Sequence, residues 1–273
     1  MTTGEPKLEE LLELAVSIAL EAGRALSDRF SAAGPTQVVT DSVRSKSSRT
    51  DLVTEADQAS EHLIVSRLAA ARPGDAVLAE ESGSTEGTSG LTWVVDPLDG
   101  TINFVYGLPV FGVSIACRSN STTQVGVVHD PIRQETFTAL AGGGAYRDGV
   151  RLRLDPGPPL GEALVGTGFS YESDRRRAQG RLLAHVLPEV RDLRRAGAAA
   201  IDLSWVACGR LDGHYEAWLA PWDHAAGSLL VTEAGGTVEE ILGLLAGHEA
   251  VPTLVAAAPG LGPPLRDLLI SAR

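Results

Sequence analysis

Two carboxylates, a glycine and a hydroxyl follow an apolar run and form the segment best suited to chemistry in this chain. Residues 92–95 lead into Asp96, and Asp99, Gly100 and Thr101 come directly after it. Carboxylates bind hard cations, and a glycine lets the backbone approach an anion closely. The residues after Gly100 could open a short helix whose free N–H groups face that anion. These residue types and spacings predict a combined metal and phosphate site.

The geometry of this segment depends on Pro97, which biases the preceding residue toward an extended conformation. The strand is therefore expected to end at Asp96, with the carboxylate at its tip and Asp99 in the turn that follows. Aspartates three residues apart also cap ordinary turns. The functional interpretation therefore depends on what else the chain supplies.

Two further acidic elements favour that interpretation. Glu80 follows its own apolar run, 76–78, and Asp223 lies between an aromatic residue and a small-residue helix expected over 225–234. An isolated buried carboxylate costs several kcal/mol of folding free energy. Three acidic elements of this kind therefore favour a functional site over decoration.

In this order the three elements resemble the inositol monophosphatase family, the metal-dependent sugar and polyol phosphatases. The resemblance begins at 46–57, continues through the Glu80 and Asp96 elements, and resumes at 194–197 and Asp223. It thus extends over nearly the whole chain. It implies an α+β / α/β fold, a layered α-β-α-β-α sandwich of the sugar phosphatase type, with the site where its two halves meet.

The resemblance also implies a set of ligands for two or three Mg²⁺ ions per site. Glu80, Asp96 and the Leu98 carbonyl are expected to hold one ion, and Asp96, Asp99 and Asp223 a second, with Asp96 as the bridge. Carboxylate and carbonyl oxygens suit Mg²⁺, whereas zinc or iron more often recruits histidine or cysteine.

The catalytic group that the resemblance implies is Thr101, Asp57 and Glu80, in which Thr101 and Asp57 would orient and help deprotonate the attacking water. No covalent phosphoenzyme is expected. The N–H groups of Gly100 and Thr101 are expected to bind phosphate oxygens, and Asp99 is expected among the phosphate- or substrate-binding residues. Lys46 matches the family pattern and has two interpretations, a residue near the site or a solvated surface lysine.

The substrate contacts implied by the resemblance are Gly197, Ala198, Ala199 and Glu216. The first three resemble the family's Gly-Ser/Thr-Ala turn, whose backbone touches the polyol ring, although Ala198 replaces the usual hydroxyl residue. Glu216 aligns with a glutamate that binds substrate hydroxyls. The alternative for Glu216 is an ordinary surface residue of a strand.

Composition agrees with an enzyme that acts on a small anion. The chain has 273 residues, 44% of them hydrophobic, enough for two cores, and its net charge of −12 argues against a nucleic-acid partner. Carboxylate-bound divalent cations would reconcile that charge with a phosphate substrate. Cys117 and Cys208 lie in apolar runs and are expected to be core residues in a reducing compartment.

No signal-peptide pattern or membrane-spanning apolar stretch stands out, so a cytoplasmic location without a membrane partner is expected. The family resemblance implies a homodimer that binds a small phosphomonoester.

Apolar periodicity predicts the order of the elements. A first helix runs from Leu8 and stops before Gly34, and a second covers about 57–71. A largely antiparallel sheet is expected from five consecutive strands, 77–79, 92–95, 110–117, 124–129 and 135–140.

The Pro-rich segment 155–159 marks the expected boundary between two domains. Residues 1–155 would form an N-terminal α+β unit with the antiparallel sheet and most metal ligands. Residues 156–273 would alternate strands and helices and supply Asp223 and the substrate contacts. The strands of this C-terminal unit are expected near 164–168, 214–218 and 253–258.

The resulting hypothesis is a Mg²⁺-dependent phosphomonoesterase that hydrolyses inositol 1-phosphate to inositol and phosphate through metal-activated water. One alternative is a relative specific for fructose 1,6-bisphosphate, histidinol phosphate or 3′-phosphoadenosine 5′-phosphate. Another is a scaffold or regulatory protein that retains the fold. A haloacid-dehalogenase-type phosphatase needs a D-x-D spacing, which Asp96 and Asp99 do not have.

Overall fold

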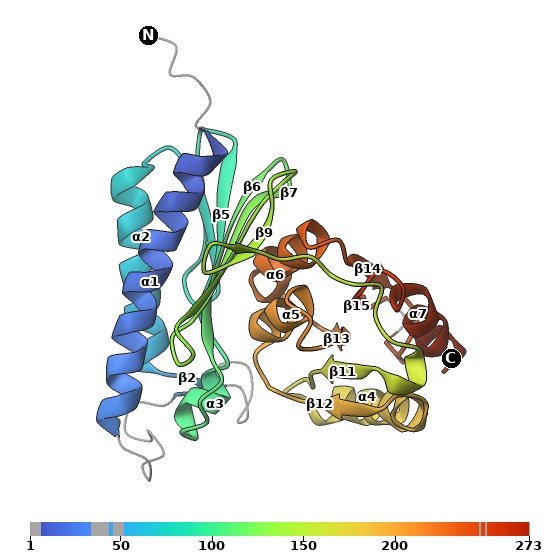
Figure 1. Cartoon of the computed structure of the whole chain (residues 1–273). Helices are drawn as coiled ribbons and strands as arrows, with labels where there is room; N and C mark the ends of the chain where they lie inside the picture. Colours follow the sequence, from blue (N-terminus) through green and yellow to red (C-terminus); the bar gives the residue numbers. More distant parts are fainter. Residues whose placement is uncertain (1–6, 34–43, 46–51, 246, 249, 273) are drawn as a thin grey trace.

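The computed structural model describes residues 7–33, 44–45, 52–245, 247–248 and 250–272 of the 273. Its helices and sheets alternate in the layer order helix, sheet, helix, sheet, helix, as Figure 1 shows. This is the expected mixed α/β sandwich. The helices of the described residues are α1 Leu8–Ala33, α2 Glu55–Ala71, α3 Thr101–Val105, α4 Ser173–Val186, α5 Ala199–Ala207, α6 Pro221–Glu233 and α7 Gly262–Ser271, with 3₁₀ turns at Leu160–Glu162 and Leu187–Glu189.

The larger sheet has the strand order β10-β9-β8-β7-β6-β5-β3-β4. Every neighbouring pair is antiparallel except β3 and β5, which are parallel. The expected antiparallel sheet is therefore confirmed, with one parallel pair that the strand pattern had not indicated. Its strands are β3 Ala76–Ala79, β4 Gly83–Thr85, β5 Leu91–Asp99, β6 Gly112–Ser119, β7 Thr122–Asp130, β8 Glu135–Leu140, β9 Gly144–Arg147 and β10 Val150–Arg151.

The second sheet has the order β12-β11-β13-β15-β14. The strands β12, β11 and β13 run parallel, and β13, β15 and β14 pair antiparallel. A separate two-stranded pair joins β1 to β2. The bounds are β1 Arg44–Ser45, β2 Leu52–Val53, β11 Leu164–Thr167, β12 Asp192–Arg194, β13 Gly213–Ala217, β14 Thr237–Ile241 and β15 Thr253–Ala257.

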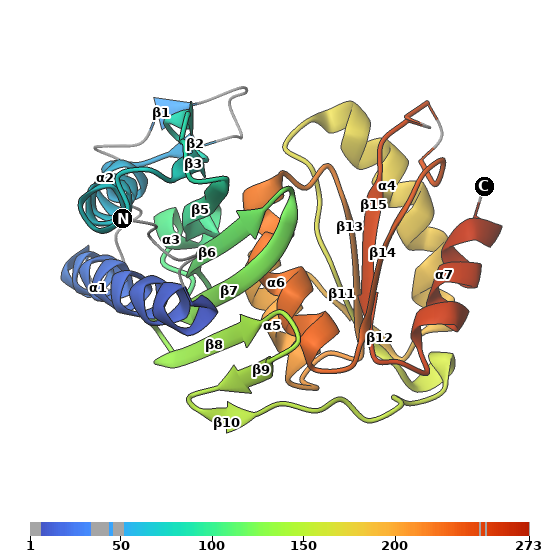
Figure 2. The ribbon, with the colours of Figure 1, turned by 90° about the horizontal axis from the view of Figure 1, so that it is seen from above.

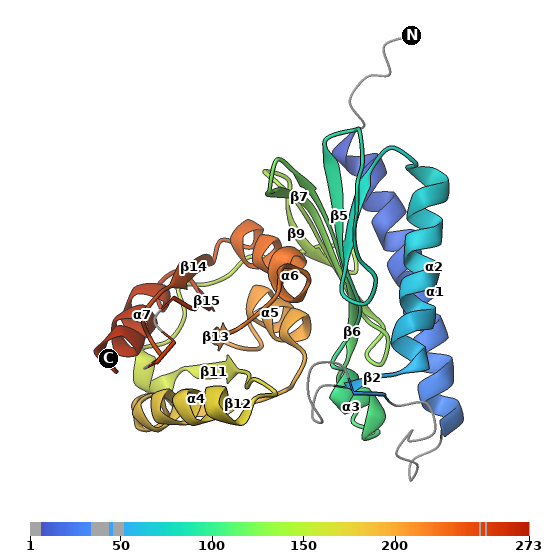
Figure 3. The ribbon, with the colours of Figure 1, turned by 180° about the vertical axis from the view of Figure 1, so that it is seen from behind.

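The helices α5 and α6 form the middle layer between the two sheets (Figures 1 and 3). They pack closely because small residues line the contacts. A Cβ on Gly126 of β7 would lie 3.0 Å from the carbonyl oxygen of Ala226 in α6. A Cβ on Gly227 would lie 2.5 Å from the Cβ of Leu203 in α5. The middle layer therefore depends on residues without side-chain bulk.

Outer helices cover the remaining faces, as the view from above shows (Figure 2). The pair α1 and α2 packs on the larger sheet through one apolar stripe of α1 that includes Leu11, Ile18 and Leu26, all buried. This stripe is the periodicity that predicted the helix, and α1 ends at Ala33 as expected. On the other side, α4 and α7 cover the second sheet.

Two element boundaries next to the predicted site residues differ from the prediction. β5 does not end at Asp96 but continues through Pro97 to Asp99, because a bulge takes up the irregularity: Asp96 pairs with Ser114, and Asp99 with Gly112. Pro97 is tolerated because the ladder is interrupted there. The helix expected over 225–234 begins at Pro221, a good first residue for a helix.

Strands of the larger sheet all precede those of the second sheet in the sequence, yet α5 and α6 pack against both. The division at residue 155 remains a prediction. In the described residues, no helix combines the length and the apolar character needed to span a membrane.

Candidate active site

The parallel pair β3 and β5 brings two of the predicted ligands side by side. Ala79 is in register with Val95, and the N–H of Glu80 donates to the Val95 carbonyl at 3.2 Å. Glu80 and Asp96 are therefore the next residues on two adjacent strands that run in the same direction. The pairing, rather than the sequence spacing, places these carboxylates together.

The bulge in β5 is held by local hydrogen bonds. The carboxylate of Asp96 accepts from the N–H of Leu98 at 3.1 Å, and the hydroxyl of Ser60 on α2 donates to the Pro97 carbonyl at 2.8 Å. The Leu98 carbonyl lies 3.2 Å from the hydroxyl oxygen of Thr101. This geometry puts Leu98 in the bulge between the two aspartates.

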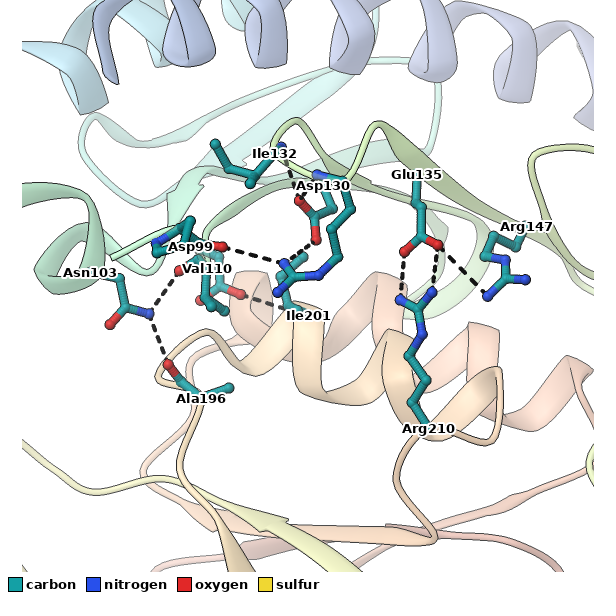
Figure 4. Close-up of polar contacts among 12 residues, drawn as sticks. Asp99, Asn103, Val110, Asp130, Ile132, Glu135, Arg147, Ala196, Ile201 and Arg210 are labelled. Atoms are coloured by element: carbon teal, nitrogen blue, oxygen red, sulfur yellow. Dashed lines mark hydrogen bonds and ion pairs between the residues drawn. The ribbon is translucent and has the colours of Figure 1, made fainter. Parts of the chain in front are cut away.

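Asp99 connects the larger sheet to the middle layer. Its carboxylate accepts from the N–H of Ala199 at 3.1 Å, of Ala200 at 2.8 Å and of Ile201 at 3.4 Å, and Figure 4 shows the last contact. These are the free N–H groups of the first turn of α5, whose own N-cap, Ala198, has no side-chain hydrogen bond. Asp99 thus caps a helix a hundred residues away and benefits from its dipole.

Gly100 is required at the bend between β5 and α3. Its φ is +93°, and a Cβ there would lie 2.9 Å from the Val110 carbonyl oxygen. Asn103, two residues into α3, holds the opposite wall. Its amide donates to the carbonyls of Val110 at 2.7 Å and Ala196 at 2.8 Å (Figure 4). The turn that contains Gly197, with φ of +88°, is thereby held against the bend.

Thr101 and Asp57 form the expected pair. The hydroxyl of Thr101 lies 2.8 Å from a carboxylate oxygen of Asp57. The other oxygen of Asp57 accepts from the N–H of Thr54 at 2.8 Å and its hydroxyl at 2.5 Å. Thr54 and Asp57 make the capping box of α2, so the helix start fixes the carboxylate. Asp57 is fully buried behind Thr101.

Asp223 arrives from the other side on the first turn of α6. Its carboxylate accepts from the N–H of Ala220 at 2.6 Å. The hydroxyl of Ser114 on β6 donates to the Trp222 carbonyl at 3.3 Å, which ties this turn to the larger sheet. The early start of α6 therefore matters, since it gives Asp223 a fixed place on a helix.

These residues surround one pocket of about 350 Å³. Its described lining carries six acidic side chains and two arginines, Arg175 and Arg195. Asp57 does not reach the pocket surface, and the structure does not describe Lys46, so its two interpretations remain open. All other predicted site residues line the pocket, namely Glu80, Asp96, Leu98, Asp99, Gly100, Thr101, Gly197, Ala198, Ala199, Glu216 and Asp223.

The acids in this pocket repel one another. Burial raises the pKa of Asp96 well above its ordinary value, and Glu80, Asp99 and Asp223 raise it further. Burial, with Glu80 next in importance, raises the pKa of Asp223 in the same way. Burial raises the pKa of Asp99 to about 7, although the N–H groups of α5 oppose that shift. The cluster is thus short of positive charge.

Hard divalent cations fit this donor set. In the described residues no three acidic, histidine or cysteine side chains already surround one point closely enough to enclose an ion. The fit rests instead on carboxylate and carbonyl oxygens, the ligands that Mg²⁺ prefers, and on a repulsion that a cation would relieve. Glu80, Asp96, Asp99, Asp223 and the Leu98 carbonyl are the groups available to hold one.

Sequence reasoning missed three residues that shape the site. Asn103 was part of the motif but had no assigned role. Asp202 on α5 and His214 on β13 are fully buried beside the pocket. His214 contacts Glu216 on one side and Asp202 on the other. The signal for His214 was its place two residues before Glu216, which puts both side chains on one face of a strand.

Comparison with known proteins agrees with this geometry. The model of the inositol monophosphatase family matches residues 7–264. Nus factor SuhB of Pasteurella multocida is 41% identical over 258 residues, which cover 92% of this chain and 92% of that protein. Inositol-1-monophosphatase SuhB of Mycobacterium tuberculosis is 45% identical over 228 residues, which cover 80% of this chain and 78% of that protein.

Solved structures share the fold. The extragenic suppressor protein suhB of Bartonella henselae superposes with a TM-score of 0.86 at 35% identity, over 95% of this chain and 98% of that one. An inositol monophosphate bound form of SaIMPase-II superposes with a TM-score of 0.74 at 25% identity, over 97% and 99% of the two chains. The fold is thus the one found in solved inositol monophosphatases. The chain belongs to the inositol monophosphatase family.

Proposed function

We propose that this protein is a Mg²⁺-dependent phosphomonoesterase that hydrolyses inositol 1-phosphate to inositol and phosphate. One observation carries the proposal. Glu80, Asp96, Asp99 and Asp223 come from three separate segments of the chain, yet they line one pocket, where the other three raise the pKa of Asp96. Such a cluster favours cation binding, and a bound cation lets an acidic pocket accept a phosphate.

The carboxylates and the Leu98 carbonyl would hold two or three Mg²⁺ ions. When bound, these ions would polarise the phosphate, activate the attacking water and stabilise the leaving oxygen. Asp96 would be the central member of this donor set, since Glu80 follows the adjacent strand β3 and Asp99 lies beyond the bulge.

Thr101 and Asp57 have the geometry to handle the proton of the attacking water. When the Thr101 hydroxyl donates to Asp57, its lone pairs are free to accept from water. Asp57 is itself fixed by two hydrogen bonds from Thr54, so the hydroxyl is held in one orientation. The N–H groups of Gly100 and Thr101 are the proposed phosphate contacts.

Pocket size and polarity support a small polyol as the leaving group. A volume of about 350 Å³ is at the lower end of ligand pockets. Glu216 supplies an acceptor for ring hydroxyls, and the turn Gly197 to Ala199 offers backbone groups at the same wall. The relative that was solved with inositol monophosphate bound supports the same substrate class. Fructose 1,6-bisphosphate, histidinol phosphate and 3′-phosphoadenosine 5′-phosphate remain the competing substrates.

The test is Mg²⁺-dependent phosphate release from inositol 1-phosphate and those three competitors. Asp96→Asn should lower kcat by roughly 100-fold or more at saturating Mg²⁺, because metal stabilisation of transition-state charge is worth several kcal/mol. Asp267→Asn is the matched control, since that carboxylate pairs with Arg266 on the exposed face of α7.

Faster hydrolysis of inositol 1-phosphate than of the three competitors supports the proposal. If a competitor is hydrolysed fastest, it replaces inositol 1-phosphate as the proposed substrate and the proposed mechanism is kept. Full activity of a folded Asp96→Asn variant would refute the role of Asp96, and release from no substrate would refute catalysis.

A second candidate function is partner binding, which the name Nus factor SuhB of the Pasteurella relative favours. Replacing the gene in its host by the Asp96→Asn version separates the two functions. A phenotype like that of a deletion supports catalysis as the physiological role, and a wild-type phenotype supports partner binding.

The family resemblance also leads us to propose a homodimer in the cytoplasm. Light scattering coupled to gel filtration would measure the mass, and cell fractionation the location. A mass of one chain would refute the dimer.

A further inference from the structure

A histidine is buried between two carboxylates directly behind the pocket. His214 and Asp202 are both 0% exposed, and neither lines the pocket. The imidazole Nε2 of His214 lies 3.3 Å from a carboxylate oxygen of Glu216, and its Nδ1 lies 3.9 Å from one of Asp202. The proposed mechanism uses neither His214 nor Asp202.

The sheet is built to make room for this arrangement. His214 and Glu216 are two residues apart on β13 and share one face. The neighbouring strand β11 and the residue that follows it have glycines opposite these two side chains. A Cβ on Gly166 would lie 2.8 Å from Nδ1 of His214, and a Cβ on Gly168 would overlap the carboxylate of Glu216. Two glycines thus leave the space that these two polar side chains occupy.

Burial makes this cluster costly unless its charges offset one another. Neither oxygen of Asp202 and neither ring nitrogen of His214 has a well-formed hydrogen bond among the described residues, so the 3.3 Å contact with Glu216 is an ion-pair distance with imperfect hydrogen-bond geometry. An apolar residue would fill the same place without the cost of burying polar atoms. Retaining the imidazole therefore calls for an electrostatic role.

The charges around His214 favour its protonated form. Burial lowers the pKa of His214, but Glu216 on its own strand, Asp202 on α5 and Asp99 at the end of β5 together raise it above its ordinary value. Burial raises the pKa of Asp202 to about 7, and His214 and Arg195 oppose that shift. Carboxylates from three elements thus act on one imidazole.

Glu216 is the member of the cluster that reaches the pocket. Its side chain is 14% exposed and lines the pocket with Asp99 and Gly197. A carboxylate that accepts hydrogen bonds from two neighbouring ring hydroxyls must be held in one rotamer. The imidazole behind it lies close enough to hold it.

We propose that His214, backed by Asp202, is a positioning residue that holds the Glu216 carboxylate aimed at the substrate, so that the pocket selects phosphomonoesters with several hydroxyl groups on the leaving alcohol. This inference rests on the proposed function, since it concerns the substrate of the same site. It adds two residues that never touch the substrate.

The first test compares a hydroxyl-rich substrate with one that has no hydroxyl groups on the leaving group. Glu216→Gln should raise KM about tenfold for the best polyol phosphate of the panel and change KM for p-nitrophenyl phosphate less than about twofold. His214→Phe should follow the same pattern at about three- to tenfold, and His214→Gln, which keeps an N–H donor, should recover part of the loss.

The variants should also be coupled. If His214 acts through Glu216, the double variant His214→Phe/Glu216→Gln should have nearly the KM of Glu216→Gln alone. In the wild type, KM for the polyol phosphate should rise as His214 loses its proton, and this rise should be absent in His214→Phe. A purely structural role would raise KM for both substrates and lower the melting temperature without that pH dependence. A raised KM for both substrates with a lower melting temperature would overturn the inference. Fully additive effects in the double variant would also overturn it.

A second measurement does not depend on turnover. Titration of the histidine ring ¹⁵N shifts, with His214 assigned from His214→Gln, should give a lower pKa for His214 in Glu216→Gln than in the wild type. An unchanged pKa would overturn the inference. Absence of hydrolysis of any hydroxylated substrate would refute the proposed function, and this titration would still decide whether His214 and Glu216 interact.

Discussion

At the scale of single residues, several side chains in the site have two tasks. Asp99 is a proposed metal ligand and also the cap of α5, and Asp57 both closes the capping box of α2 and orients Thr101. A carboxylate has about four acceptor positions, so it can serve a helix and a ligand together. The site is therefore rigid because its residues also hold secondary structure.

Thr101 gives the clearest prediction at this scale. Thr101→Val removes the hydroxyl that lies 2.8 Å from Asp57 and should lower kcat about 100-fold with little change in KM, as expected for a lost proton-transfer group. Steady-state kinetics at saturating Mg²⁺ would measure both constants. Thr101→Ser keeps the hydroxyl and is the control. Equal losses in the two variants would show that the hydroxyl alone does not account for the effect.

At the scale of elements, the middle helices decide whether the site forms. α6 holds Asp223 on its first turn and packs against β7 without room for one more carbon. α5 begins at the carboxylate of Asp99. The two helices thus bring Asp223 and the first N–H groups of α5, both from late in the sequence, to the proposed metal ligands on the larger sheet.

Gly126→Ala tests this contact. The new Cβ would lie 3.0 Å from the Ala226 carbonyl oxygen, so α6 must move, and overpacking of this kind costs about 1–3 kcal/mol of unfolding free energy. Displacement of Asp223 should also raise the Mg²⁺ concentration needed for half-maximal activity. Chemical denaturation and a Mg²⁺ titration measure these effects.

Gly180→Ala is the matched control, because a Cβ on Gly180 of α4 meets nothing within 4 Å. It should stabilise the protein by up to about 1 kcal/mol, since alanine is the better helix former. Equal stability of the two variants would contradict the close contact between β7 and α6.

At the scale of the whole molecule, the acid cluster couples stability to pH and to metal. The folded-state pKa of Asp99 is about 7 against an ordinary value of 3.8, and those of Asp96 and Asp223 are raised as well. The native state therefore keeps protons that the unfolded chain releases. The stability these acids contribute is fully present below their ordinary pKa and is lost as pH rises toward and through 7.

Metal should reverse that loss. In the metal-free protein the melting temperature should decline as pH rises from about 5 to 8, as far as these acids control it. Saturating Mg²⁺ should raise it by about 5–10 °C near pH 8, because a ligand at roughly 100 times its dissociation constant contributes about 2.7 kcal/mol. The increment should be smaller near pH 5, where protons compete with the ion. Calorimetry with and without a chelator measures this, and an increment independent of pH would contradict the coupling.

Local signals in the sequence predicted much of the outcome. Periodicity predicted α1 and the strands on either side of the site, and the residue types around Asp96 and Asp99 indicated the pocket that now contains them. Pro97 misled the prediction of the strand end, because a local conformational preference does not reveal that β6 continues the pairing beyond a bulge. The start of α6 was missed for a related reason, since small and aromatic residues precede its periodic segment.

By itself the sequence determined which residues are candidates for the chemistry, because a carboxylate can bind a cation wherever it stands and the motifs are local. Only the tertiary structure decided that Glu80, Asp96, Asp99 and Asp223 share one pocket, that Asp99 caps α5, and that His214 lies between Asp202 and Glu216. Those relations arise from strand register, helix packing and burial. These involve residues far apart in the chain, and no spacing along the sequence encodes the distance between them in space.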